Sequence, residues 1–150
     1  MTSFFQFEQD FIQSMRCIPM VVRYKLDSSG VKMKLEHWSS FDDSEKQQCV
    51  EMPCETTDEA QTYHETLQAL IEAKTGAKAK VLEIPENPLW KQTEIPAQVL
   101  EKAEACNVEI SIEQWQRLEN LQRFALIKLS RPSHENRNFV PAMKEFGLIS

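Results

Sequence analysis

The chain has 150 residues, a formal net charge of −6 and a mean hydropathy of −0.46, with 41% hydrophobic and 27% charged residues. These values are ordinary for a single globular domain and exclude a disordered or fibrous chain, while the negative charge argues against general binding to nucleic acid or anionic lipid. No run approaches the roughly twenty apolar residues of a membrane span, and no secretory signal opens the chain, so we expect a cytoplasmic protein that contacts neither membrane nor nucleic acid.

The predicted elements follow one another along the chain as helices and connections. A first helix is expected from about Phe7, and a later one starts at the Thr56–Glu59 capping box and ends at Gly76. Residues 77–92 form a linker whose apolar residues should hold it against the surface, and residues 139–146 form a final short helix. The apolar anchors of the linker are Leu82, Ile84, Leu89 and Trp90.

An internal repeat organises the rest of the chain. Residues 17–53 match residues 94–130 without gaps at an offset of 77. Seven residues of the first copy recur identically in the second: Ile18, Pro19, Val22, Lys25, Val31, Glu36 and Trp38.

Each copy is predicted to form a helical hairpin. Its first helix opens at Pro19 or Pro96, where the missing proline N–H costs nothing, and closes at Gly30 or Asn107, which tolerate the left-handed conformation. A longer second helix follows, with apolar stripes at helical spacing. These stripes contain Leu35, Trp38, Phe41, Cys49 and Met52 in the first copy, and Ile112, Trp115, Leu118, Leu126 and Leu129 in the second.

The two second helices differ on their outer faces. Ser44, Gln47 and Gln48 of the first copy correspond to Leu121, Phe124 and Ala125 of the second. The second helix of the second copy should therefore be the more deeply buried one, and Trp38 and Trp115 should be buried in both copies. The expected fold is a single all-α domain over residues 1–150, a helical bundle built from two pseudo-symmetric hairpin repeats.

A polar run at 130–138 separates two apolar elements and is the first place where chemistry could reside. Its guanidinium, amide, hydroxyl and imidazole groups suit an anion or the acidic surface of a partner. The alternative, favoured on local sequence alone, is a solvated connection in which Ser133 caps a helix and Arg131 neutralises the preceding carbonyls. The candidate residues are Arg131, Ser133, His134, Asn136, Arg137 and Asn138.

The cysteines are a second candidate group. Antiparallel packing within the first hairpin should place Cys17 near Cys54, whereas the matching positions of the second copy, Glu94 and Arg131, could form an ion pair. Two nearby thiols, with His134, could bind a metal or exchange electrons, although buried free cysteine is commonly a small hydrophobe. No CxxC pair is present, so we expect free thiols, no structural zinc site and no bound cofactor.

Several phrases resemble those of the nitrate reductase associated family. They include Phe5-Gln6-Phe7-Glu8, Arg16-Cys17-Ile18-Pro19-Met20, Arg23-Tyr24-Lys25-Leu26-Asp27, Gly30-Val31-Lys32 and the run Leu121-Gln122-Arg123-Phe124-Ala125-Leu126-Ile127-Lys128-Leu129. The resemblance implies an accessory protein without a catalytic constellation. Its expected partner is the catalytic subunit of a molybdenum-dependent assimilatory nitrate reductase, which it would help to mature, with cofactor insertion as one step it could assist. The alternative is a small metal-binding or redox protein using Cys17, Cys54 and His134.

Overall fold

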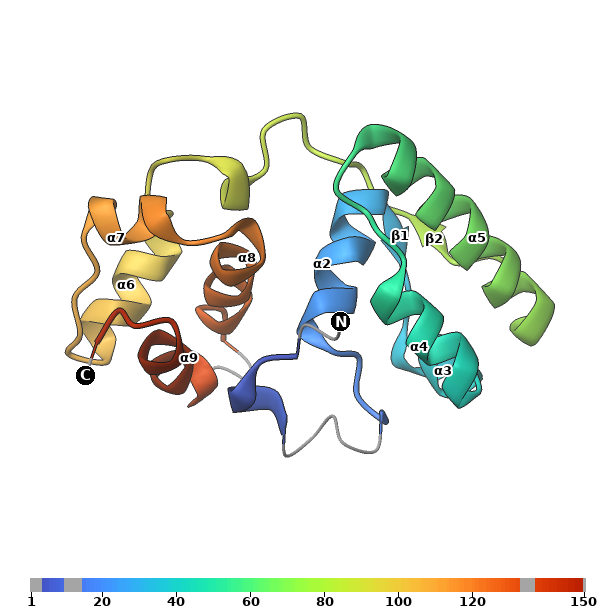
Figure 1. The fold of residues 1–150 in the computed structure, drawn as a ribbon, viewed down its shortest axis with the longest axis horizontal. Coiled ribbons are helices and arrows are strands. Elements are labelled where there is room, and N and C mark those ends of the chain that lie inside the picture. The colour runs from blue at the N-terminus through green and yellow to red at the C-terminus, as the bar shows by residue number, and fades with distance from the viewer. Residues whose placement is uncertain (1–3, 10–14, 133–136, 150) are drawn as a thin grey trace. The chain divides into compact units, whose positions relative to one another are not determined.

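The computed structural model describes residues 4–9, 15–132 and 137–149. The chain divides into two compact units, Met1–Pro85 and Glu86–Ser150, and the boundary falls within the predicted linker. The described residues are mostly helical, with one short two-stranded sheet (Figure 1). None of the helices in this part of the chain combines the length and the apolar character that crossing a membrane requires.

Unit 1 places helix α5 against helix α2, with a short sheet beside them (Figure 1). Strand β1 pairs antiparallel with β2, and Val31 lies opposite Val81. The elements are a 3-10 helix η1 at Gln6–Glu8, α2 at Met20–Ser29, β1 at Val31–Lys32, α3 at Leu35–Ser39, α4 at Asp43–Glu51, α5 at Thr57–Thr75 and β2 at Lys80–Val81.

Unit 2 is built around helix α8, which packs against η2, α6 and α9. In Figure 1, α6, α7, α8 and α9 can be followed in chain order to the C-terminus. The elements are a 3-10 helix η2 at Leu89–Lys91, α6 at Ala97–Ala105, α7 at Ile112–Arg117, α8 at Asn120–Leu129 and α9 at Phe139–Glu145.

The predicted helix ends are confirmed where a capping motif was recognised. Thr56 accepts a hydrogen bond from the Glu59 N–H at 3.1 Å, and α5 ends at Gly76 with φ 90°. Gly30 and Asn107 both adopt the left-handed conformation, with φ 80° and 57°. Proline opens α2 and α6 as expected, as the residue directly before each helix.

The prediction of one longer second helix in each hairpin is wrong. The structure has two short helices in its place, α3 and α4 in unit 1 and α7 and α8 in unit 2. Asp42 starts α4 with its own capping box, accepting from the Glu45 N–H at 2.8 Å. In unit 2, the Gln122 side chain accepts from the Glu119 N–H at 2.9 Å at the start of α8. Each of these caps favours a new helix start over continuation of the preceding helix.

The connection after α5 contains a strand, so the described chain is mostly helical rather than all-helical. Gln68 is buried on α5 and exchanges two hydrogen bonds with the backbone of Ala79, at 2.8 and 2.9 Å. This pairing brings β2 beside β1, where the Leu82 N–H donates to the Gly30 carbonyl at 2.8 Å. At the N-terminus, where a helix was expected from about Phe7, η1 is followed by Gln9 in α-helical conformation, and residues 10–14 lie outside the described range.

The predicted burial of the helices is largely confirmed. Trp38 and Trp115 are each 0% exposed, and α8 buries Phe124 and Ala125, where α4 presents polar side chains. The exceptions are three residues expected in the apolar stripes. Leu35 and Ile112, the first residues of α3 and α7, are 55% and 44% exposed, and Met52, which follows α4, is half-buried.

Both units hold their buried tryptophan by the same set of polar contacts. Trp38 Nε1 donates to the Met15 carbonyl at 2.8 Å, and Lys46 Nζ donates to the same oxygen at 2.9 Å. In unit 2, the corresponding hydrogen bonds run from Trp115 Nε1 and Arg123 Nη1 to the carbonyl of residue 92, at 3.2 and 3.4 Å. Each cation also lies over its indole ring, 5.5 Å away for Lys46 and 5.8 Å for Arg123.

The two left-handed glycines provide a matched test of the β1–β2 contact. A Cβ at Gly30 would lie 2.8 Å from the Leu82 carbonyl oxygen, whereas one at Gly76 would meet nothing within 4 Å. Gly76→Ala should lower the free energy of unfolding by about 1 kcal/mol, from left-handed strain alone. Gly30→Ala should cost about 1 to 3 kcal/mol more, because the neighbouring strand must shift. Urea unfolding of both variants checks this, and equal losses would contradict the close approach.

Arg123 should be the more sensitive of the two cations. It is 8% exposed, and it donates to the carbonyls of Trp115 and Gln116 at 3.0 Å in addition to its contacts upstream. Arg123→Met should lower the free energy of unfolding by about 2 to 4 kcal/mol, because buried carbonyls lose their donors. Lys46→Met should cost less, since Lys46 is only half-buried. Denaturant unfolding compares the two, and the opposite order would count against this account.

Candidate functional site

The polar run is described at its two ends. Arg131 follows α8 and is exposed, Arg137 is exposed before α9, and Asn138 is the half-exposed N-cap of α9. The proposed capping by Ser133, together with His134 and Asn136, lies outside the described residues. The arginines thus frame a connection between two helices whose apolar residues are buried.

The ion pair that Glu94 and Arg131 could have formed is absent from the described residues, to which both side chains belong. The carboxylate–ammonium pair in this part of the chain joins Glu45 Oε1 to Lys74 Nζ at 3.1 Å. Within the described residues, the guanidinium groups of Arg131 and Arg137 contact no carboxylate. Both arginines are exposed.

Cys54 is a buried thiol in unit 1. It is 5% exposed, and its Sγ donates to the Lys25 carbonyl at 3.6 Å. Burial raises the pKa of Cys54 to about 11, against the opposing effect of the Lys25 ammonium. Cys49, nearby on α4, has its pKa raised to about 12 by burial and by Glu45. A thiol that stays protonated at neutral pH is a poor nucleophile and a poor metal ligand.

Lys25 is held by the end of α4 rather than by an acid. Its ammonium donates to the carbonyls of Val50 and Met52, both at 2.6 Å, where a helix presents unpaired acceptors. Burial lowers the pKa of Lys25, and the charge of the Glu55 carboxylate acts in the other direction. These hydrogen bonds give Lys25 a structural role, because they hold α2 against the end of α4.

The metal hypothesis finds no support in the described residues. Across residues 4–9, 15–132 and 137–149, no three histidine, cysteine or acidic side chains gather closely enough to hold a metal ion. Cys17 is half-buried, His134 lies outside the described range, and the closeness of Cys17 to Cys54 stays a prediction.

Sequence reasoning missed Glu8. This acid is 1% exposed and accepts hydrogen bonds from the Met20 N–H at 3.0 Å and the Phe5 N–H at 3.2 Å. It therefore caps α2 from twelve residues upstream, at a helix whose proline N-cap has no side chain able to accept. No local signal could have found it, because the partner is remote in sequence.

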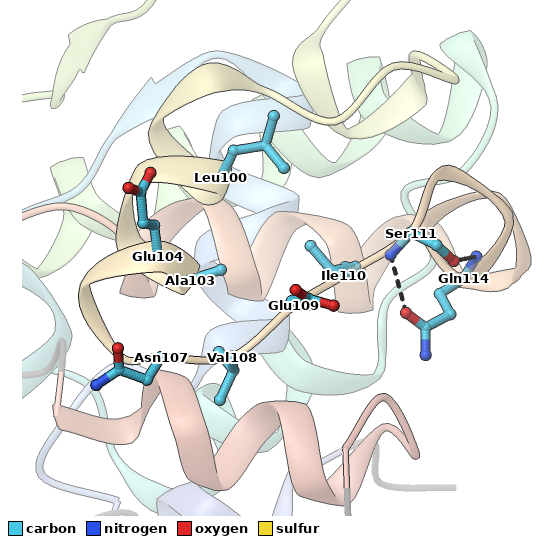
Figure 2. Close-up of a pocket in the computed structure, with 9 residues that line it drawn as sticks. All are labelled: Leu100, Ala103, Glu104, Asn107, Val108, Glu109, Ile110, Ser111 and Gln114. Atoms are coloured by element: carbon cyan, nitrogen blue, oxygen red, sulfur yellow. Dashed lines mark hydrogen bonds between the residues drawn. The ribbon is translucent and has the colours of Figure 1, made fainter.

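Sequence reasoning also missed a hollow of about 670 Å³ in unit 2. One side comes from α6 and the other from the extended segment that leaves it, as Figure 2 shows. Leu100 is 45% exposed there, and Glu104 and Glu109 are exposed acids. The lining residues are Leu100, Ala103, Glu104, Asn107, Val108, Glu109, Ile110, Ser111 and Gln114.

The described residues thus form a mostly helical chain with exposed arginines at the two ends of one connection and exposed acids beside a hollow. The chain belongs to the family of conserved nitrate reductase-associated proteins, whose model matches residues 4–146. No curated protein and no solved structure matches the chain. The family is described by an association with nitrate reductase and not by a reaction.

The raised thiol pKa of Cys54 has a measurable consequence. At pH 8, a thiol with a pKa near 11 is ionised about a hundredfold less than one at its ordinary value of 9.0. Iodoacetamide should therefore modify Cys54 roughly a hundredfold more slowly in the folded protein than in urea, as followed by peptide mass spectrometry.

The raised pKa of Cys54 also predicts how the free energy of unfolding changes with pH. Because folding raises the pKa of Cys54, its contribution is fully present below pH 9 and is lost as the pH rises through about 11. The free energy of unfolding of the wild type should fall over this range more than that of Cys54→Ala.

For the iodoacetamide experiment, equal alkylation rates in folded and unfolded protein would contradict the burial of the thiol.

Proposed function

We propose that this protein is a cytoplasmic accessory factor for a molybdenum-dependent assimilatory nitrate reductase. It acts by recognising the catalytic subunit during maturation, and assistance to cofactor insertion is the step that such a contact would serve. The observation that carries this proposal is family membership across residues 4–146. A recognition role also agrees with buried cysteines whose thiols stay protonated.

The contact surface that we propose is the segment from Arg131 to Asn138. It is supported by the exposure of Arg131 and Arg137, and by the absence of carboxylate partners for them within the described residues. A guanidinium free of internal pairing can form two parallel hydrogen bonds with a carboxylate or phosphate. The partner would therefore present an acidic patch or an anionic cofactor group.

We further propose that the two units descend from one repeated hairpin. Helices α2, α3 and α4 begin at residues 20, 35 and 43, and α6, α7 and α8 each begin 77 residues later. The tryptophan–carbonyl–cation contacts described above are separated by the same interval. Duplication accounts for both facts, and subsequent divergence accounts for the different outer faces of α4 and α8.

Recognition through the C-terminal segment predicts separable effects on function and folding. Arg137→Ala and His134→Ala should weaken binding to the reductase by roughly ten- to a hundredfold each, the loss expected for one charge-assisted hydrogen bond of about 1.5 to 3 kcal/mol. The variants are tested for nitrate reductase activity in a strain lacking the native protein and by pull-down of the catalytic subunit. Thermal unfolding should hardly change.

The matched control is Arg117→Ala, which removes an exposed arginine at the end of α7, outside the segment. It should restore full activity. If Arg137→Ala and His134→Ala restore full activity as well, this segment is not the contact surface. If they unfold the protein, the solvated connection with a structural role is the better account. Failure of the wild-type chain to retain the reductase would defeat the proposed function itself.

A further inference from the structure

In unit 1, the segment after α2 is covered by a strand. Gly30 and Val31 are buried, with Val31 0% exposed, because β2 pairs with β1. The pairing sets Lys32 opposite Lys80, and the Leu82 N–H donates to the Gly30 carbonyl at 2.8 Å. The strand covers this segment mainly through backbone hydrogen bonds.

In unit 2, no strand among the described residues pairs with the matching segment after α6. Asn107 and Glu109 are exposed and Val108 is half-exposed. The Val108 N–H donates to the Ala103 carbonyl at 2.9 Å, which closes the end of α6. Within the described residues, however, the Glu109 N–H and the carbonyls of Asn107 and Glu109 make no hydrogen bond. These are the positions whose counterparts in unit 1 lie along the strand pairing.

The hollow lies at this segment. Figure 2 shows the stretch from Asn107 to Ser111 running past Leu100, Ala103 and Glu104 of α6. The available backbone groups of Glu109 therefore border a hollow of about 670 Å³ that has an exposed leucine on its far side. The segment is extended but is not part of a sheet, and exposed extended backbone offers the same donors and acceptors by which a strand edge binds an extended peptide.

We propose that this hollow binds an extended segment of a partner protein, rich in basic and apolar residues, which pairs with the backbone of Glu109 as β2 pairs with β1. The charge of the rim selects the occupant, because Glu104 and Glu109 are both exposed acids. A basic residue opposite Glu109 forms a favourable cross-strand pair, whereas in unit 1 two lysines face each other. Leu100 receives an apolar side chain of the incoming segment.

Asn107 limits the length of the pairing. Its counterpart, Gly30, has no side chain, and a Cβ there would lie 2.8 Å from the Leu82 carbonyl oxygen and 3.1 Å from Ile84 Cγ1. A strand bound in unit 2 must therefore bend away beside Asn107. The contact is short, centred on Glu109, and suits a transient partner rather than a permanent subunit.

The identity of the partner rests on the proposed function, but peptide binding in the hollow can be tested without knowing the partner. The probe is a capped synthetic peptide with the sequence of residues 77–83, Ala-Lys-Ala-Lys-Val-Leu-Glu, which already contains a strand able to pair in this way. Titrated into the full chain, it should shift the backbone amide resonances of Val108, Glu109 and Ile110 in a saturable manner. The same peptide with both lysines replaced by glutamate should bind at least about fivefold more weakly.

Two charge reversals and a matched control define the site on the protein. Glu104→Arg and Glu109→Arg should each weaken peptide binding by about two- to fivefold, the range for exposed ion pairs. Glu101→Arg reverses an exposed acid of the same helix that does not line the hollow, and it should leave the affinity unchanged. Unchanged thermal unfolding shows that each variant folds, and Glu104→Arg, on an exposed helix face, keeps the test valid if Glu109→Arg does not fold.

Four results would overturn the inference. They are equal weakening by Glu101→Arg, equal binding of the glutamate peptide, amide shifts confined to Val31 and Lys32, and shifts at Glu109 that depend on protein concentration without peptide. The last would indicate a second copy of the chain as the occupant. If the peptide binds but the chain does not retain the reductase, the proposed function is wrong and binding in the hollow still stands. If the chain retains the reductase but does not bind the peptide, the inference about the hollow is wrong and the proposed function still stands.

Discussion

The structure of each unit depends on one partly buried interaction, in which an indole N–H and a cationic side chain share a single backbone carbonyl. Trp38 and Lys46 meet at Met15, and Trp115 and Arg123 meet at residue 92. The contact joins the segment before α2 to α3 and α4 in unit 1, and the segment before α6 to α7 and α8 in unit 2. Met15 has φ 57°, a strained conformation for this residue type, and two donors on its carbonyl help to hold it there.

The two units have the tryptophan–carbonyl–cation contact in common but expose different surfaces. Lys46 serves a half-buried site in unit 1, whereas Arg123 is buried and also satisfies the last carbonyls of α7. In unit 1, α5 and β2 cover α2 and β1, while α4 leaves a polar face exposed. In unit 2, α9 and η2 cover α8 instead, and the segment after α6 is left open. The different covering elements therefore determine which part of each unit is accessible to a partner.

Local signals predicted the helix ends well, and remote contacts set the limit of sequence analysis. The Thr56 cap, the left-handed Gly30 and Asn107, and the burial of both tryptophans followed from residue type and spacing. The break before α4 had a readable signal in Asp42 and Glu45, which the continuous apolar stripe outweighed. Capping of α2 by Glu8, the strand at β2 and the hollow beside Glu109 had none, because each depends on segments brought together by folding. Of the candidate site residues, sequence indicated the exposed arginines but could not show what faces them.

The shared acceptor in each unit is a main-chain oxygen. The two hydrogen bonds to it therefore do not require a particular side chain at that position. Methionine occupies it in unit 1 and glutamine in unit 2, yet the same two types of donor reach the carbonyl. Other side chains can therefore replace those at residues 15 and 92, provided that the backbone keeps its path and that the residue at position 15 tolerates a φ of 57°. The tryptophans and the cations cannot be replaced in this way, because their side chains are the donors. Substitutions at the donors should therefore be tolerated much less well than substitutions in the connecting segments.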